Sequence, residues 1–112
     1  MDKQHHEILS ILQEENAEVI QAVSKIFRFG IDTQWNGQTN REQLEEELGD
    51  VLAMIDILCT TGIVDLDKLK VAKNAKLEKL KIWSNITIVP KVDDLHVYDD
   101  ERLVSIFDKA SK

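Results

Sequence analysis

The 112-residue sequence has one cysteine and no apolar run long enough to cross a membrane. Cys59 has no second cysteine to pair with, so an intramolecular disulfide is excluded, and its neighbours Ile57 and Leu58 predict a buried thiol. The absence of a membrane-length run, and of a signal-peptide pattern in the first residues, predicts an intracellular, cytoplasmic protein with no membrane partner.

Basic residues are too few to give the chain a positive surface. There are 14 of them against 21 acidic residues, a formal net charge of −7, which argues against a nucleic-acid polymer as partner. Free nucleotides remain compatible, because a metal ion can neutralise their phosphates. The sequence also lacks a Walker-type glycine loop, a nucleophilic-serine elbow and a Cys-x-x-Cys pair, so nothing indicates the mechanisms that depend on them.

Apolar residues at helical spacing, bounded by capping residues, predict three helices of about 3–28, 40–60 and 66–83. The expected start and stop signals are Asp2, Gly30, the Thr39–Glu42 capping box, Gly62 and Asp65. Residues 29–40 are expected to form a loop. The predicted fold class is therefore all-α, an antiparallel helical bundle, and a second subunit would help so short a chain to complete an enzyme cleft.

Two pairs of acidic residues interrupt the apolar faces of the first two helices. Glu15 and Glu18 fall within the stripe of the first helix, and Glu47 and Asp50 border that of the second. In an antiparallel hairpin both pairs lie about 9–13 Å from the connecting loop, so they are expected at similar heights. Four facing carboxylates repel one another and need a counter-charge. Oxygen ligands suit Mg²⁺, for which Mn²⁺ could substitute.

These acids carry a resemblance to a known family. The two motifs are Glu14-Glu15-x-x-Glu18 and Glu46-Glu47-x-x-Asp50. With the phrase Glu-Glu-Leu-Gly-Asp-Val-Leu and the 27 residues between the motifs, the pair resembles the signature of MazG-like all-α nucleoside triphosphate pyrophosphohydrolases, over about residues 8–83. The resemblance implies Mg²⁺-dependent hydrolysis of a nucleoside triphosphate, standard, deoxy or non-standard, between the α and β phosphates. The products would be a nucleoside monophosphate and pyrophosphate, and the enzyme a homodimer or homotetramer.

The resemblance and the inward spacing together suggest roles for individual residues. The expected metal ligands are Glu15, Glu18, Glu47 and Asp50, and the expected catalytic residues are Glu14, Glu15 and Glu46. Glu14 is the better candidate for orienting or deprotonating the attacking water. The phrase Lys73-Asn74-Ala75-Lys76-Leu77 resembles the helix that follows the metal motif in this family, which makes Lys73, Asn74 and Lys76 candidates for phosphate or metal-water contacts.

Trp35 is a large aromatic residue in the polar loop before the second helix. Such a residue either packs beneath its loop, which is the commoner case, or offers a ring face to a nucleobase. Both interpretations stay open, and Trp35 is kept as a candidate substrate contact.

A non-enzymatic interpretation of the acids also remains. The inward carboxylates of a helical interaction module could pair with Lys73, Arg41 or basic residues of a partner. A relative of the family could also bind nucleotides without hydrolysing them.

The sequence changes character after Trp83. A β-prone run at 86–89 predicts a short extended segment, and residues 101–109 predict a small helix. The expected organisation is a MazG-like helical catalytic domain, 1–83, followed by a C-terminal extension, 84–112, which either packs on its own subunit or contacts a neighbouring one.

Overall fold

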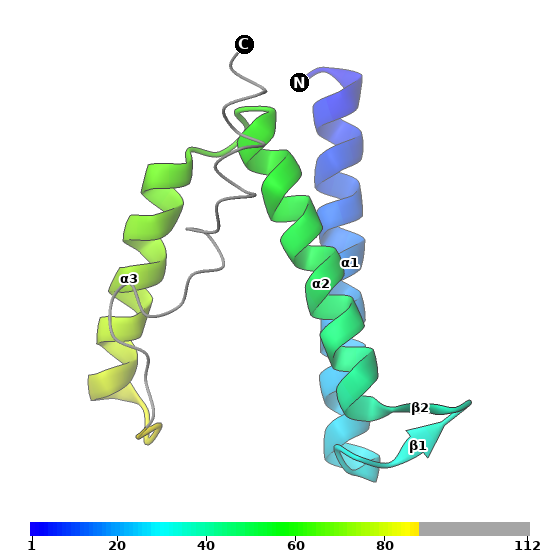
Figure 1. Ribbon diagram of the computed structural model, residues 1–112. Helices are drawn as coiled ribbons and strands as arrows, with labels where there is room; N and C mark the ends of the chain where they lie inside the picture. The colour runs from blue at the N-terminus through cyan, green and yellow to red at the C-terminus, as the bar shows by residue number, and fades with distance from the viewer. Residues whose placement is uncertain (88–112) are drawn as a thin grey trace. The chain divides into compact units, whose positions relative to one another are not determined.

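The computed structural model describes residues 1–87, which form three helices and one short hairpin (Figure 1). In chain order the elements are α1 (Lys3–Phe29), β1 (Gln34–Trp35), β2 (Gln38–Thr39), α2 (Asn40–Thr60) and α3 (Leu66–Trp83). The all-α class and the three predicted helices are confirmed. The expected extended segment at 86–89 lies partly outside the described residues, and the expected helix at 101–109 lies entirely outside them.

The chain divides into two compact units, each of which is described by itself. The N-terminal unit, Met1–Ile57, contains α1, the hairpin and most of α2. The C-terminal unit, Leu58–Lys112, contains the end of α2 and α3. The division at 83/84 into a catalytic domain and an extension stays a prediction.

Helix α1 begins and ends where its capping residues predict. The Asp2 carboxylate accepts a hydrogen bond from the His5 backbone N–H at 2.7 Å, which satisfies a free donor of the first turn. Gly30 ends the helix with φ +104°, and its N–H donates to the Ile26 carbonyl at 2.8 Å. Since residues that carry a side chain rarely adopt this backbone angle, the helix stop requires glycine.

The Gly30 stop supports a paired stability prediction. A Cβ on Gly30 would meet Thr33 Oγ1 at 3.0 Å in addition to the unfavourable φ, so Gly30→Ala should lower the free energy of unfolding by about 1–3 kcal/mol. Gly49 lies inside α2 and a Cβ there would meet no atom within 4 Å, so Gly49→Ala should raise it by about 0.5–1 kcal/mol. Urea denaturation measures both changes, and equal shifts for the two variants would contradict this account.

The connection between α1 and α2, expected to be an irregular loop, in fact contains a β-hairpin. Gln34 pairs with Thr39 and Trp35 with Gln38 in an antiparallel register. The turn residues Asn36 (φ +54°) and Gly37 (φ +78°) both have positive φ, as a two-residue hairpin turn of type I′ requires. The Asn-Gly dipeptide is the strongest short-range signal for such a turn, and the loop prediction overlooked it.

The start of α2 is held by the predicted capping box. The Glu42 N–H donates to Thr39 Oγ1, and the Thr39 N–H donates to Glu42 Oε1, both at 3.0 Å. The Thr39 N–H and the Thr39 hydroxyl both donate to Glu42 Oε1 and lower the pKa of Glu42, the backbone bond contributing most. The connection is fixed further by the Arg41 N–H, which donates to the Ile31 carbonyl at 2.8 Å. The hairpin is therefore tied to the helix that follows it.

Helices α1 and α2 lie side by side and antiparallel in the N-terminal unit (Figure 1). We call their facing surfaces the α1–α2 seam; it carries Glu15, Ala22 and Lys25 from α1, and Gln43, Glu47 and Asp50 from α2. Lys25 Nζ donates to Gln43 Oε1 at 3.5 Å near the hairpin end. Ala22 is only 1% exposed, and it lies one turn before Lys25 on the same face of α1. The antiparallel arrangement predicted for the two acidic motifs is therefore present.

The C-terminal unit also follows its predicted signals. The Asp65 carboxylate caps α3 by accepting a hydrogen bond from the Lys68 N–H at 3.0 Å. Cys59 is buried, as expected from its apolar surroundings. Across residues 1–87, none of the helices combines the length and apolar character needed to cross a membrane.

Candidate functional site

Three carboxylates from two helices converge in the middle of the seam. Glu15 on α1, and Glu47 and Asp50 on α2, each offer one oxygen, and the three oxygens lie within 4.8 Å of one another. Glu15 and Glu47 are half-buried, whereas Asp50 is exposed. We call these three residues the carboxylate cluster. The structure thus brings together three of the four residues expected to bind metal.

Partial burial, followed by mutual repulsion, raises the pKa of two members of the cluster. For Glu15 the largest cause is loss of solvation, followed by repulsion from Asp50 and a hydrogen bond between the two carboxyl groups. For Glu47 loss of solvation again comes first, followed by repulsion from Glu18 and then Asp50. Both shifts disfavour the ionised form of these carboxylates in the folded, metal-free protein.

Glu18, the fourth predicted ligand, lies beside the cluster and not within it. Its side chain is exposed, and its oxygens are not part of the group that meets within 4.8 Å. Its charge nevertheless raises the pKa of both Glu15 and Glu47. Glu18 therefore adds negative charge at the edge of the same site.

No basic side chain neutralises the cluster within the described residues. None of the ion pairs in residues 1–87 includes Glu15, Glu47 or Asp50. Arg41, which the interaction-module interpretation offered as a partner, binds Asp32 through two hydrogen bonds of 2.9 and 3.3 Å. That pairing lowers the pKa of Asp32 and removes Arg41 as a counter-charge for the inward acids.

The carboxylate cluster fits a hard divalent cation. Mg²⁺ takes oxygen ligands about 2.1 Å away, so two of its ligands lie at most about 4.2 Å apart. The three oxygens already lie within 4.8 Å, and small side-chain rotations are sufficient to close the difference. The donor set contains neither sulfur nor imidazole, which favours Mg²⁺ or Mn²⁺ over softer metals.

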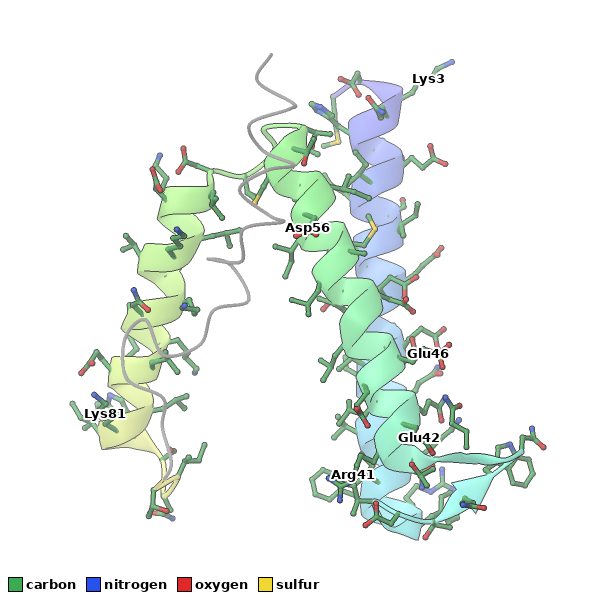
Figure 2. The ribbon with its side chains drawn as sticks, in the orientation of Figure 1. Lys3, Arg41, Glu42, Glu46, Asp56 and Lys81 are labelled. Atoms are coloured by element: carbon green, nitrogen blue, oxygen red, sulfur yellow. The ribbon has the colours of Figure 1, made fainter. Side chains whose placement is uncertain are left out.

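Glu14 and Glu46, the remaining acids of the two motifs, have different surroundings. Glu14 is exposed, and its charge contributes to the raised pKa of Glu15. Glu46 Oε2 accepts a hydrogen bond from Gln38 Nε2 at 2.9 Å, so it links α2 to β2. Figure 2 labels Glu42 and Glu46 on the side of α2 that faces the hairpin. Periodicity alone did not indicate the contact with Gln38.

The other predicted substrate contacts fall in two places. Trp35 lies on β1 and is 73% exposed, so it does not pack beneath the loop, and its ring is open to a ligand. Lys73, Asn74 and Lys76 lie on α3 in the C-terminal unit. Their contact with phosphate or with metal-bound water stays a prediction.

The raised pKa values predict how pH changes the stability of the metal-free protein. Because the folded state holds protons on Glu15 and Glu47 more tightly than the unfolded chain, whose carboxyls titrate near 4.5, these residues make the free energy of unfolding fall as pH rises above about 4.5. Asp32 and Glu42, whose pKa values are lowered, act in the opposite direction.

The difference in the free energy of unfolding between a variant and the natural chain isolates the contribution of Glu15 and Glu47. Urea denaturation in the presence of a chelator, repeated from acid to neutral pH, should show Glu15→Gln/Glu47→Gln gaining stability over the natural chain as pH rises. Asp32 and Glu42 are unchanged in both proteins and cancel in the difference. A pH-independent difference would show that the two carboxylates titrate normally.

A comparison with known families agrees with this site. Residues 3–81 match the family model described as the MazG nucleotide pyrophosphohydrolase domain. No curated protein and no solved structure gives a significant match to the chain. The matched residues are more than two thirds of the chain, and they include both acidic motifs and all of α1 and α2. The chain therefore belongs to the MazG nucleotide pyrophosphohydrolase family.

Proposed function

We propose that this protein hydrolyses a nucleoside triphosphate between its α and β phosphates in a Mg²⁺-dependent reaction, releasing a nucleoside monophosphate and pyrophosphate. The observation that carries the proposal is the convergence of Glu15, Glu47 and Asp50 from two helices without a basic partner among the described residues. Membership of the MazG family supports the same reaction.

The proposed roles follow from where each acid lies. Glu15, Glu47 and Asp50 would hold Mg²⁺, and Glu18 would join them from the next turn of α1. When bound, the ion supplies positive charge for the triphosphate oxygens and lowers the pKa of coordinated water. Glu46 would keep the hairpin docked on α2 through Gln38.

Glu14 is the proposed general base, because it is exposed beside Glu15. A Glu14 carboxylate oxygen would accept a proton from water while the water oxygen forms a bond to the α-phosphorus. The bond from that phosphorus to the bridging oxygen breaks, and pyrophosphate leaves with the electron pair. Chemistry of this kind depends mainly on positioning and on electrostatic stabilisation.

A product assay tests the proposal directly. With standard, deoxy and modified nucleoside triphosphates as a panel, at least one should give pyrophosphate and the matching monophosphate, and a chelator should stop the reaction. A diphosphate and inorganic phosphate as first products would refute the bond assignment. Metal-dependent stabilisation without turnover of any member would indicate a nucleotide-binding relative. The absence of both would favour the interaction module.

We also propose that the protein acts as a homodimer or homotetramer. On α1, Ile20 and Phe27 lie two turns apart and are 70% and 85% exposed; on α2, Leu48 and Leu52 are exposed one turn apart. Apolar helix faces of this kind are usually covered by another subunit. Sedimentation velocity should give at least twice the mass of one chain, and a monomer at assay concentration would contradict the proposal.

A further inference from the structure

A cavity of about 440 Å³ opens at the hairpin end of the N-terminal unit. Its lining residues are Lys25, Phe29, Thr33, Gln34, Trp35 and Asn40. They come from the end of α1, the hairpin and the first residue of α2. We propose that this cavity receives the nucleobase of the substrate. The inference rests on the proposed function only in taking the bound nucleotide to be a triphosphate.

Aromatic side chains form two walls of the cavity. Trp35 and Phe29 both line it, and both are largely exposed although they are apolar. The Arg28 guanidinium lies 4.9 Å from the centroid of the Phe29 ring, so one face of that ring is already covered. Trp35 has no such neighbour among the described aromatic contacts. Every nucleobase has a π-face that can stack on an indole, whatever its polar edge.

Asn40 supplies a buried polar group with a fixed orientation. The residue is only 5% exposed, and its Nδ2 donates to the Gly30 carbonyl at 2.8 Å. A carbonyl cannot donate, so this bond identifies which end of the amide is nitrogen. Asn40 Oδ1 accepts no hydrogen bond from any described residue. It is also not fully enclosed, so a ligand atom can reach it. Because Asn40 lines the cavity, we infer that Oδ1 serves there as an acceptor for a base N–H.

The cavity lies on the same helix faces as Glu47 of the carboxylate cluster and Glu18 at its edge. Lys25 follows Glu18 by seven residues, and Asn40 precedes Glu47 by seven. Seven residues make about two turns and about 10 Å, so each pair lies on one face of its helix. The sugar and α-phosphate of a nucleotide can bridge this distance. A triphosphate held at the carboxylate cluster would thus place its base near the cavity.

The chemistry of the walls defines the ligand. Stacking needs a flat heteroaromatic ring, and Asn40 Oδ1 needs a donor N–H on its edge. Lys25 and Gln34 add N–H donors for a carbonyl oxygen or ring nitrogen. Lys25 Nζ lies 3.5 Å from Gln43 Oε1, a long contact that a ligand acceptor could replace. The cavity therefore suits a nucleobase. Inorganic triphosphate has no aromatic ring that could stack on Trp35.

The test uses Trp35 as its own reporter. The chain has two tryptophans, so Trp83→Phe leaves Trp35 as the sole one. Nucleoside monophosphates, added to millimolar concentration without metal, should quench Trp35 fluorescence in a saturable way. Inorganic triphosphate should not. No saturable change with any standard base, or an equal change with inorganic triphosphate, would overturn the inference.

Kinetics give a second readout with a matched control. Trp35→Ala should raise KM for the hydrolysed nucleotide about tenfold, with kcat within about twofold, because stacking is lost while the reacting phosphates are untouched. Trp35→Phe should restore most of the affinity. Trp83→Ala removes an equally exposed tryptophan from α3 and should leave KM unchanged.

The two proposals fail in different ways. Hydrolysis with unchanged KM in Trp35→Ala, together with no fluorescence response, would refute the base cavity and leave the pyrophosphohydrolase proposal standing. Base-dependent quenching in a protein that hydrolyses nothing would support the cavity and refute the reaction.

Discussion

Glu47→Gln should reduce Mg²⁺-dependent pyrophosphate release by at least about 100-fold, since even residues that only support metal ligands contribute about 10–100-fold. The amide has nearly the same shape as the carboxylate but carries no charge, so the cluster loses one of its negative charges. The same change should raise the free energy of unfolding of the metal-free protein. Glu47 is repelled by Glu18, Asp50 and Glu15, and the substitution removes that repulsion.

Two measurements separate these effects. Pyrophosphate release under saturating nucleotide reports activity, and urea denaturation with and without Mg²⁺ reports stability. The natural chain should be stabilised by the metal, whereas Glu47→Gln should be more stable without metal and respond to it little. Glu45→Gln, on the exposed surface of the same helix, is the matched control and should change neither quantity. Full activity in Glu47→Gln would remove Glu47 from the metal site.

Ala22→Leu should disrupt the site from a distance. Ala22 is 1% exposed and lies in the seam between Glu18 and Lys25. Lys25, one turn later on the same face, contacts Gln43 of α2, so a larger side chain at this buried position should push the two helices apart. Overpacking of this kind costs about 1–3 kcal/mol. Because Glu15 lies on α1 and its partners lie on α2, separation of the helices would also weaken metal binding and activity.

The control for this prediction lies on the other side of the same helix. Ala17 is exposed, so Ala17→Leu should change the free energy of unfolding by no more than about 0.5 kcal/mol. Urea denaturation gives the stability of both variants, and thermal unfolding with added Mg²⁺ gives the retained metal response. If Ala22→Leu kept the stability and metal response of the natural chain, close approach at this position would not be what holds the carboxylates together.

Both predictions express one property of the N-terminal unit. Its helix interface contains carboxylates that destabilise the metal-free fold, as the raised pKa values of Glu15 and Glu47 indicate. Buried apolar side chains, among them Ile8, Ala22 and Met54, stabilise the N-terminal unit around them. Packing around the carboxylate cluster, and not interactions within it, therefore keeps the site in place. Such an arrangement is common where function requires like charges to meet.

Local signals were sufficient for the helices and for most of the acidic site. Asp2, Asp65 and the Thr39–Glu42 box act within one turn of the backbone, so each helix start could be read from adjacent residues. The inward acids followed from the 3.6-residue period of each helix. The prediction for residues 29–40 was incomplete because it counted polar turn formers and overlooked the Asn36-Gly37 pair.

The sequence by itself determined the three helices, their capping residues, the two acidic motifs and the family. Only the tertiary structure decided that Glu15, Glu47 and Asp50 meet while Glu18 stays at the edge, that Glu46 binds Gln38, and that Trp35 and Asn40 share a cavity. The reason is physical: caps and periodicity depend on neighbours within a turn or two. Distances between side chains on different elements depend on how closely α1 and α2 approach and on the direction in which the hairpin leaves them.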